Sequence, residues 1–296
     1  MPLRDAMELI GRARAGGYAV GYFESWSLDS FQGVLDAAEA TRSPILIGVN
    51  GEFLSRPGRL AAEQLSWYAA LGRAAAAAAT VPCGLIFNEC ADDAWSRAAV
   101  DLGFSLVMPD DPAAGPAEFA ARVAALAQYA HQRGVAVEAE VGHLPCGVPG
   151  TLGDEAGALT DPDEAARFVQ ATGVDLLAVS IGNVHIRLQG TQGLDLEHLA
   201  RVRARVDVPF DLHGGSGIAG EALRAAIRLG VAKVCYGTYV KQRYLDAVRR
   251  GLDAAGPNPH RALGFGGPED LLVAGRRAVK DAVLERIGVL GCCGKA

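Results

Sequence analysis

The sequence predicts an α/β protein, and more specifically a (β/α)8 barrel with extra C-terminal helices. Short apolar runs of strand length alternate with longer helical patterns along nearly all of the 296 residues. Alternation of this kind indicates a parallel sheet whose strands are joined by crossover helices. The strand-helix unit occurs eight times, which favours a closed barrel over an open sheet.

The predicted strands are short runs rich in Val, Ile, Leu and aromatic residues, and their composition is typical of buried parallel strands. In chain order, they are Tyr18–Phe23, Pro44–Val49, Cys83–Phe87, Phe104–Met108, Val135–Val141, Leu176–Ile181, Val208–Leu212 and Ala232–Tyr236.

Helical patterns fill the intervals between these runs. They cover Met7–Arg14, about Leu28–Ala40, about Leu60–Ala79, Asp92–Leu102, Ala117–Arg133, Pro162–Thr172, Leu196–Val206 and a stretch that starts near Glu221. The segment after Pro257 is expected to add helices that pack on the barrel. Because no linker or composition shift interrupts the series, we expect one domain over residues 1–296.

Composition limits the possible partners and the compartment. The net charge of −6, without a basic block, argues against nucleic acid as a partner. No apolar run reaches the roughly 20 residues that cross a bilayer, so no membrane association is expected. Six cysteines without regular spacing favour a reducing compartment over a disulfide framework. We therefore expect a cytoplasmic protein with a small-molecule substrate.

In a barrel of this type the active site lies at the carboxyl ends of the strands. Polar residues follow the predicted strands there, while the strands themselves are apolar. These residues are Glu24, Asn50, Asn88, Glu89, Asp110, Asp111, His143, Asn183, His185, His213, Gly237 and Thr238.

Three of these residues form a candidate metal site. Glu89, His185 and His213 follow the third, sixth and seventh strands. Two imidazoles and one carboxylate can bind zinc or another divalent ion and leave a position open. The alternative is that each is a solvated loop residue, which is the commoner role of a single histidine.

The fifth strand contains two carboxylates, Glu138 and Glu140, in an otherwise apolar run. Their spacing of two places them on one face, which we expect to be the upper interior of the barrel. Carboxylates there need a cation, a histidine N–H or a proton. A buried structural ion pair is the alternative to a functional role.

The glycine-rich turn after His213 is a candidate phosphate site. Its backbone N–H groups can line up on an oxyanion, and barrels often bind phosphate after strands seven and eight. The turn also matches G-x-G-x-x-G, but the acidic residue that a dinucleotide site needs is missing, so phosphate is preferred. The predicted phosphate and substrate contacts are Gly214, Gly215, Ser216, Cys235, Gly237 and Thr238.

Several motifs together resemble the class II, metal-dependent ketose-bisphosphate aldolases. They are GYAVGYF, VAVEAEVG, IGNVH, LHGGSG and the closing GKA, and the resemblance runs from about Leu9 to Ala296. It implies a (β/α)8 barrel, a homodimer or higher homo-oligomer, and a divalent metal, commonly zinc. The metal polarises a ketone so that an enediolate of a dihydroxyacetone-phosphate-like substrate can form. The resemblance assigns His185 and His213 as metal ligands and Glu140 as a metal-proximal carboxylate.

The chain departs from the family at the positions that do the chemistry. The family has an aspartate that moves a proton where this chain has Asn88, which cannot act as an acid or base. Glu89 stands in place of a metal-binding histidine, and Cys235 in place of an asparagine that helps hold the enediolate. Carboxylates that the family usually lacks are present at Glu24 and Asp211, and Asp211 shares a strand face with His213.

The loss of one acid beside the gain of others predicts a site adapted to a different substrate. His143, Asp211 and Asp110 are the candidate replacements for the missing acid/base, and the sequence does not rank them. We therefore expect a metal-dependent, aldolase-type lyase that acts on a phosphorylated, sugar-like ketone, with ordinary fructose-bisphosphate cleavage doubtful. The alternatives are an enediolate-forming isomerase, epimerase or aldol-type synthase, and an inactive barrel that binds sugar phosphate.

Overall fold

The computed structural model describes residues 3–145, 157–185, 190 and 192–296. Eight parallel strands form a closed barrel in which each strand pairs with the next and β8 returns to β1. All eight predicted strands are confirmed, with ends that differ by at most three residues. The strands are β1 Val20–Glu24, β2 Ile45–Asn50, β3 Cys83–Cys90, β4 Leu106–Pro109, β5 Ala136–Val141, β6 Leu176–Val179, β7 Phe210–Leu212 and β8 Val231–Tyr236.

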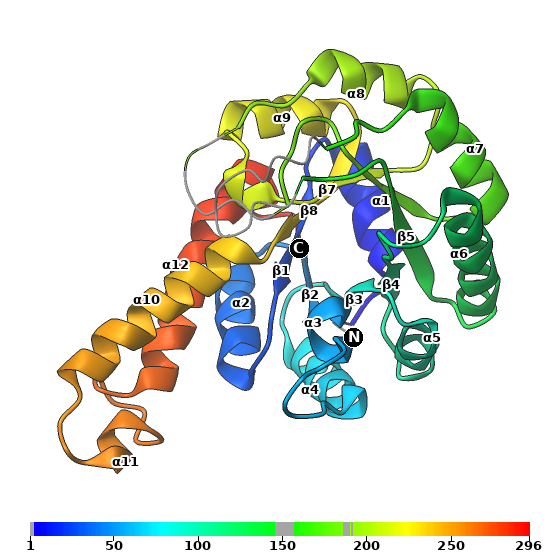
Figure 1. The fold of residues 1–296 in the computed structure, drawn as a ribbon. Helices are drawn as coiled ribbons and strands as arrows, with labels where there is room; N and C mark the ends of the chain where they lie inside the picture. Colours follow the sequence, from blue (N-terminus) through cyan, green and yellow to red (C-terminus); the bar gives the residue numbers. More distant parts are fainter. Residues whose placement is uncertain (1–2, 146–156, 186–189, 191) are drawn as a thin grey trace.

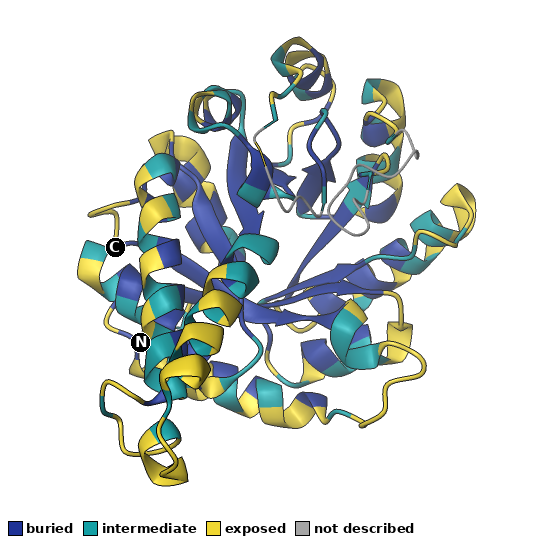
Figure 2. Ribbon diagram, turned by 60° about the vertical axis from the view of Figure 1, so that its left-hand side comes forward, coloured by how far each residue is buried: buried dark blue, intermediate teal, exposed yellow. Residues whose placement is uncertain are grey.

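Helices surround this barrel and turn their buried faces toward it (Figures 1 and 2). They are α1 Ala6–Gly16, α2 Leu28–Thr41, α3 Gly51–Ser55, α4 Leu65–Ala78, α5 Asp93–Asp101, α6 Pro116–His131, α7 Pro162–Thr172, α8 Leu196–Arg203 and α9 Gly220–Arg228. Local chemistry fixes their ends. The Asp92 and Asp161 side chains accept hydrogen bonds from the first N–H groups of α5 and α7, and Gly173 ends α7 with φ 70°.

The barrel core depends on close contact between neighbouring strands. Gly48 on β2 lies against β3, where an added Cβ would stand 1.9 Å from the Ile86 carbonyl oxygen. No side chain fits at that distance, so glycine permits the two strands to pair. The largest fully buried side chains include Tyr22, Phe87 and Phe210, and one buried charge, Lys233, lies among them.

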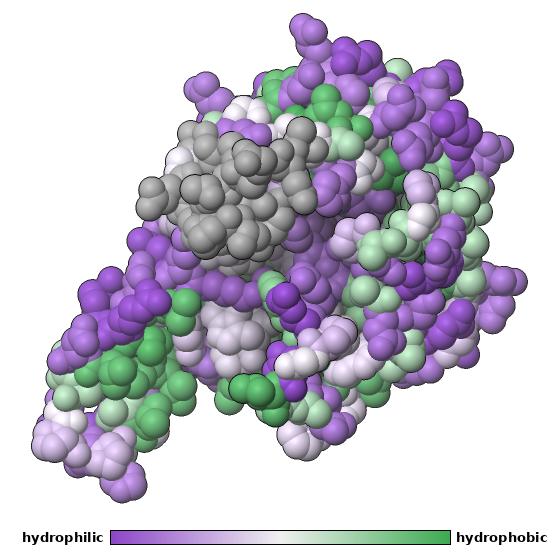
Figure 3. Space-filling model, viewed as in Figure 1, coloured by the Kyte–Doolittle hydropathy of each residue, from purple (hydrophilic) through white to green (hydrophobic). Residues whose placement is uncertain are grey.

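The C-terminal helices form an arm beside the barrel. Helices α10 (Thr238–Ala254) and α12 (Leu271–Leu290) pack against each other, and α11 (Pro259–Ala262) lies at the tip (Figure 1). The predicted packing on the barrel is confirmed for α12, which contacts α2, α9 and β1, whereas the tip projects away. Apolar side chains gather on the arm (Figure 3). None of the helices within the described ranges is long and apolar enough to cross a membrane.

Candidate metal centre and substrate pocket

Two adjoining pockets at the carboxyl end of the barrel contain the predicted metal ligands. The main pocket is lined by residues that end β1, β2, β3, β7 and β8, including Glu24, Asn88 and Thr238. The acidic pocket is lined by residues at the carboxyl ends of β4 and β5, including Asp110 and Glu140. Glu89 and His185 line both pockets.

Glu89 owes its position to an irregularity in β3. The pairing of β3 with β4 shifts register between Phe87 and Cys90, and Glu89 has a left-handed backbone with φ 52°. Successive residues of a regular strand face opposite sides, but here Asn88 and Glu89 both line the main pocket. A non-glycine residue in this conformation is strained, and strain of this kind is concentrated at functional sites.

The structure brings the three predicted metal ligands together. The His185 Nε2 atom lies 2.9 Å from Glu89 Oε1, and His213 Nδ1 lies 2.6 Å from the same oxygen. One ligand atom from each residue falls within 4.8 Å of the others. We call Glu89, His185 and His213 the metal trio. Two imidazoles and a carboxylate converging beside a pocket fit a divalent ion that takes the place of the protons between them.

Without a metal, hydrogen bonds and charge couple the trio. Burial alone would raise the pKa of the Glu89 carboxyl, but His185 and His213 hold it well below its usual range. The Glu89 charge raises the pKa of His185 to about 9. Burial disfavours the charged His213 ring, yet Cys235 and Glu89 raise its pKa well above the usual value. The trio therefore favours positive charge between its ligand atoms, as a cation site requires.

Two asparagines hold the trio in place. The Asn50 side-chain amide donates a hydrogen bond to Glu89 Oε2. Asn183 is fully buried, donates to the His213 carbonyl oxygen at 3.1 Å and accepts from the Ile181 N–H at 2.9 Å. Their place at strand ends marked both residues in the sequence, but the sequence did not indicate these partners.

Beneath His213 lies a group of buried polar and charged side chains. Sequence reasoning allowed a buried ion pair for Glu138 but did not anticipate its partners. Lys233 Nζ donates to Glu138 Oε2 at 2.7 Å, to Asp211 Oδ2 at 3.1 Å and to Cys235 Sγ at 3.1 Å. We call Glu138, Asp211, Lys233 and Cys235 the buried cluster. A lysine within the apolar run of β8 was the available signal, since an unpaired lysine is almost never buried.

The buried cluster changes the interpretation of two predicted residues. Asp211 does face the same side as His213, and its Oδ2 lies 3.0 Å from His213 Nε2. Asp211 is nevertheless fully buried, with the ring of His213 between it and Glu89. Burial would raise its pKa, but Lys233 and His213 lower it, so it stays ionised. For Glu138, the alternative of a buried ion pair is confirmed.

The predicted acid/base candidates Asp110 and His143 lie in the acidic pocket together with Glu140. Burial and the charge of Glu89 raise the pKa of Asp110 to about 6. Burial raises the pKa of Glu140 to about 7, although His213 opposes the shift. Both groups can therefore gain or lose a proton near neutral pH, which suits proton transfer.

The predicted phosphate residues surround the other side of the main pocket. Gly214 has φ 68°, and an added Cβ would stand 1.9 Å from the Val184 carbonyl oxygen, so only glycine allows the turn after His213. Ser216 lies in the following 3-10 turn, η1 (Gly215–Gly217). Helix α10 begins at Thr238, which lines the main pocket together with Gly237. The N–H of Tyr239, in the first turn of α10, donates to Ser216 Oγ at 3.2 Å and so ties the helix start to the glycine-rich turn.

A lysine on α10 completes this side of the pocket. Lys241 Nζ donates to Glu24 Oε1 at 2.5 Å, and both side chains line the main pocket. Burial raises the pKa of Glu24, and Lys241 opposes the shift. Sequence reasoning noted Glu24 but missed Lys241, because the two residues are far apart in the chain and meet only through the closure of the barrel.

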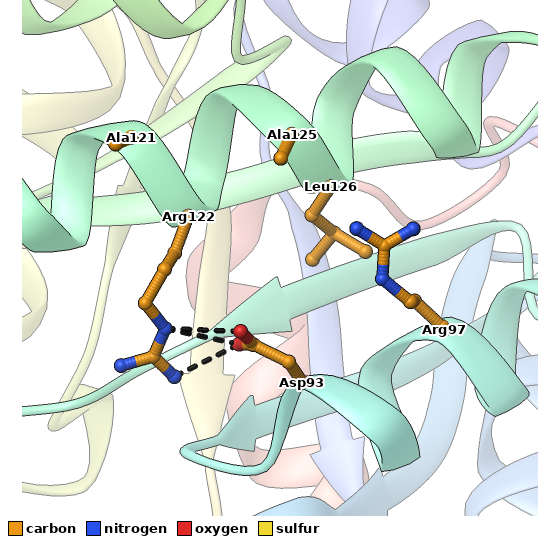
Figure 4. Close-up of a pocket in the computed structure, with 6 residues that line it drawn as sticks. All are labelled: Asp93, Arg97, Ala121, Arg122, Ala125 and Leu126. Carbon is orange, nitrogen blue, oxygen red and sulfur yellow. Dashed lines mark hydrogen bonds and ion pairs between the residues drawn. The ribbon is translucent and has the colours of Figure 1, made fainter.

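Another hollow lies outside the barrel, between α5 and α6 (Figure 4). Asp93 is the one carboxylate among the described residues that line it, and it is paired with Arg122 at 2.8 Å. No histidine or cysteine accompanies them. Among the described residues, this hollow therefore lacks the metal-binding and nucleophilic side chains that are found at the barrel end.

Across residues 4–295, the sequence matches the family described as fructose-bisphosphate aldolase class-II. The chain belongs to this family. The resemblance read from the sequence motifs is thus confirmed, and so is the barrel. The family is metal-dependent, and the metal trio supplies candidate ligands for the ion.

Relatives cover essentially the whole chain. A fructose-bisphosphate aldolase from Geobacillus stearothermophilus is 32% identical over 302 residues, which span 100% of this chain and 99% of that protein. An uncharacterized protein, YdjI of Escherichia coli K12, is 34% identical over 287 residues, 94% of each chain. The crystal structure of the YdjI aldolase matches with a TM-score of 0.81 and 32% identity over 99% of both chains. The protein is therefore a divergent class II aldolase family member.

Proposed function

We propose that the protein is a divalent-metal-dependent, aldolase-type lyase that acts on a phosphorylated, sugar-like ketone through an enediolate. The observation that carries the proposal is the convergence of Glu89, His185 and His213 beside a pocket whose other wall contains the glycine-rich turn after β7 and the start of α10. The altered residues around that pocket support a substrate other than fructose bisphosphate.

In such a reaction, different residues of the chain would bind the metal and the phosphate. A bound divalent ion, zinc in our proposal, would act as a Lewis acid on the substrate carbonyl, with Glu140 as a further ligand or orienting group. Gly214, Gly215, Ser216, Gly237 and Thr238 hold the phosphate through N–H and hydroxyl groups. Cys235 lies beside them on the pocket floor.

Residues of the acidic pocket carry out the proton transfer in this proposal. Asn88 has no proton to exchange, and Asp211 is shielded from the pocket and engaged by Lys233. Asp110 and His143 are therefore the preferred acid/base groups, and Asp211 orients His213 through its hydrogen bond to Nε2.

The wider predictions enter the same proposal. We infer one domain over residues 1–296 and a homodimer or higher homo-oligomer, as the family implies. A cytoplasmic location is supported by the free thiols of the five cysteines within the described ranges. The partner is a small phospho-ketone, with no nucleic acid or membrane involved.

Metal analysis and product analysis test the lyase proposal together. Purified protein is reconstituted with Zn²⁺, Mn²⁺ or Co²⁺, washed, assayed for bound metal, and supplied with dihydroxyacetone phosphate and an aldehyde panel. We expect about one equivalent of metal and an aldol product. Less than about a tenth of an equivalent of every ion would contradict the proposal. Ligand-induced thermal stabilisation without turnover would instead indicate the inactive barrel.

Asn88 favours a second candidate, an isomerase, epimerase or synthase that forms the enediolate but does not need the family's aspartate. Such an enzyme would exchange the α-protons of dihydroxyacetone phosphate with solvent deuterium and form no cleavage products. Aldol cleavage or condensation with any aldehyde in the panel would exclude the isomerase and the epimerase, whereas condensation without the reverse cleavage would indicate the synthase.

A further inference from the structure

Tyr22 is a buried residue of the main pocket whose hydroxyl group has no hydrogen-bond partner among the described residues. It lies on β1, is 2% exposed and lines the pocket beside the metal trio. Its hydroxyl oxygen makes no hydrogen bond to any residue in the described ranges. Buried tyrosine hydroxyls usually have a partner, so this one indicates a ligand in the pocket.

The polar neighbours of Tyr22 are already engaged with other groups. Lys233, whose ammonium lies 5.5 Å from the centre of the Tyr22 ring, donates to the three other members of the buried cluster. Glu24 pairs with Lys241, and Glu89 pairs with the two histidines of the trio. The hydroxyl group is therefore free to donate to a molecule that enters the main pocket.

The residue next to Tyr22 in the sheet does not supply that donor. Cys235 on β8 is the register partner of Tyr22 on β1. Its thiol donates to Asp211 Oδ2 at 3.2 Å and accepts from Lys233, so its hydrogen bonds are directed into the buried cluster. Thiols are also weak donors. Of this adjacent pair, the phenol is the stronger donor and the one left without a partner.

A second unpartnered polar atom supports a ligand at the same place. The Asn88 Oδ1 atom, on β3, is buried without a hydrogen-bond partner among the described residues, and Asn88 also lines the main pocket. A hydroxyl donor and an amide oxygen acceptor are both uncharged at neutral pH. They match the alternating carbonyl and hydroxyl oxygens of a ketose.

We propose that Tyr22 is a catalytic residue that donates a hydrogen bond to the ketose oxygen on which negative charge develops as the enediolate forms. The proposal rests on the proposed function, since it requires enediolate chemistry in this pocket. The phenol keeps its proton throughout, so no bond to Tyr22 forms or breaks. Its contribution is a fixed donor aimed at the developing charge.

Two matched variants test this role in the metal-reconstituted, full-length protein. Tyr22→Phe removes one hydroxyl from the pocket. Tyr236→Phe removes one from β8 that is equally buried and also unpartnered, but whose ring stacks on Phe23 away from the pocket. The probe is dihydroxyacetone phosphate, and the readouts are its Kd, the rate of deuterium incorporation from D₂O, and the Tm of the ligand-free protein.

For Tyr22→Phe we expect deuterium incorporation to slow by about 100-fold, because the lost donor serves the transition state. The Kd should weaken by less than about tenfold, since one neutral hydrogen bond contributes little to ground-state binding. The Tm should stay equal or rise, because an unpartnered buried hydroxyl does not stabilise the ligand-free fold. Tyr236→Phe should leave exchange and Kd unchanged.

Three results would overturn the assignment. Exchange by Tyr22→Phe within about twofold of the wild-type rate would show that the hydroxyl is not used in catalysis. A lower Tm with unchanged exchange would assign Tyr22 a structural role. If the wild-type protein itself neither binds nor exchanges the probe, the proposed function fails, and the assignment of Tyr22 fails with it. If the wild-type protein exchanges the probe and Tyr22→Phe does so equally fast, only the assignment of Tyr22 fails.

Discussion

Two sets of potential metal ligands share His213, and they differ in what lies between their ligand atoms. The upper set is the metal trio of Glu89, His185 and His213. The lower set is Asp211, His213 and Cys235, whose ligand atoms also fall within 4.8 Å of one another. Glu89 and His185 of the upper set line both pockets, whereas Asp211 of the lower set is fully buried and lines neither.

The lower set already contains a cation. The Lys233 ammonium lies 3.1 Å from both Asp211 Oδ2 and Cys235 Sγ, and a metal ion there would meet a fixed positive charge. The partners of Glu89 among the described residues are His185, His213 and Asn50, none of which is permanently charged. Similar donor groups thus serve two purposes. The lower set is neutralised by the protein, and the upper set is left for an added cation.

Removal of a ligand from the upper set alone should have the largest effect. His185→Ala takes away one imidazole at a side chain that is 32% exposed, so the fold should tolerate the change. We expect bound metal to fall well below one equivalent and turnover to drop by at least about 1000-fold, because the carbonyl loses its Lewis acid. Metal content by mass spectrometry and product formation measure both.

His131→Ala is the matched control. Its side chain is 44% exposed, and its Nε2 lies 2.8 Å from Asp175 Oδ2, almost the geometry of the pair between His185 and Glu89. His131 ends α6 at the opposite end of the barrel. We expect full metal content and activity in this variant. Metal retention by His185→Ala would show that the lower set, not the upper, holds the ion.

Loss of the cation from the lower set should damage the fold. Lys233→Met keeps most of the side-chain volume but leaves Glu138 and Asp211 buried without their shared partner. Breaking a buried pair in this way costs about 3–5 kcal/mol of the free energy of unfolding. Urea denaturation of the metal-free protein measures the change.

Lys241→Met provides the comparison, since Lys241 forms a similar lysine–carboxylate pair but is 32% exposed. Water reaches the lysine end of that pair, so the loss should be smaller than for Lys233→Met. If the two variants lose equal stability, the buried cluster does not depend on the charge of Lys233, and the contrast between the two ligand sets fails.

The sequence predicted the barrel and the upper set because both follow from local patterns. Apolar runs repeat with strand and helix lengths, and the carboxyl ends of parallel strands meet at one face. Glu89, His185 and His213 were therefore expected to meet, although their separation in the chain is large. The unusual backbone of Glu89 was not expected, because a bulge in β3 depends on its pairing with β4.

The lower set could not be predicted in the same way. Alternation along a strand indicates which side chains face inward, but it does not give their depth in the barrel. Asp211 and His213 share a face of β7, yet His213 lies at the pocket and Asp211 lies beneath it. The partnership of Glu138 with Lys233, which are 95 positions apart, arises only when the barrel closes.

Asp110 and Asp111 should differ in how they make the stability of the protein depend on pH, because only Asp111 is paired with a cation among the described residues. Burial and Glu89 raise the pKa of Asp110 to about 6, from 3.8 in the reference state. Arg122 lowers the pKa of Asp111, with which it forms a hydrogen-bonded ion pair at 2.5 Å. The folded state thus binds the Asp110 proton more tightly than the unfolded state, and the reverse holds for Asp111.

The linkage sign follows from these shifts. Between about pH 4 and pH 6 the metal-free native state keeps a proton on Asp110 that the unfolded state has lost, so stability falls as pH rises. Asp110→Asn should remove that fall and stabilise the metal-free protein near neutral pH by at most about 3 kcal/mol. Asp111→Asn should destabilise it near neutral pH, and this loss should shrink as pH falls toward 4 and below.

Bound metal should then reverse the result at Asp110 alone. A divalent cation in the upper set favours the ionised carboxylate, so the stability gained by Asp110→Asn should shrink or disappear after reconstitution. Asp111, held by Arg122, should respond much less. Urea denaturation of both variants across this pH range, with chelator and with metal, measures the difference. A loss of stability in metal-free Asp110→Asn near neutral pH would mean that the upper set is already compensated by the protein, as the lower set is by Lys233.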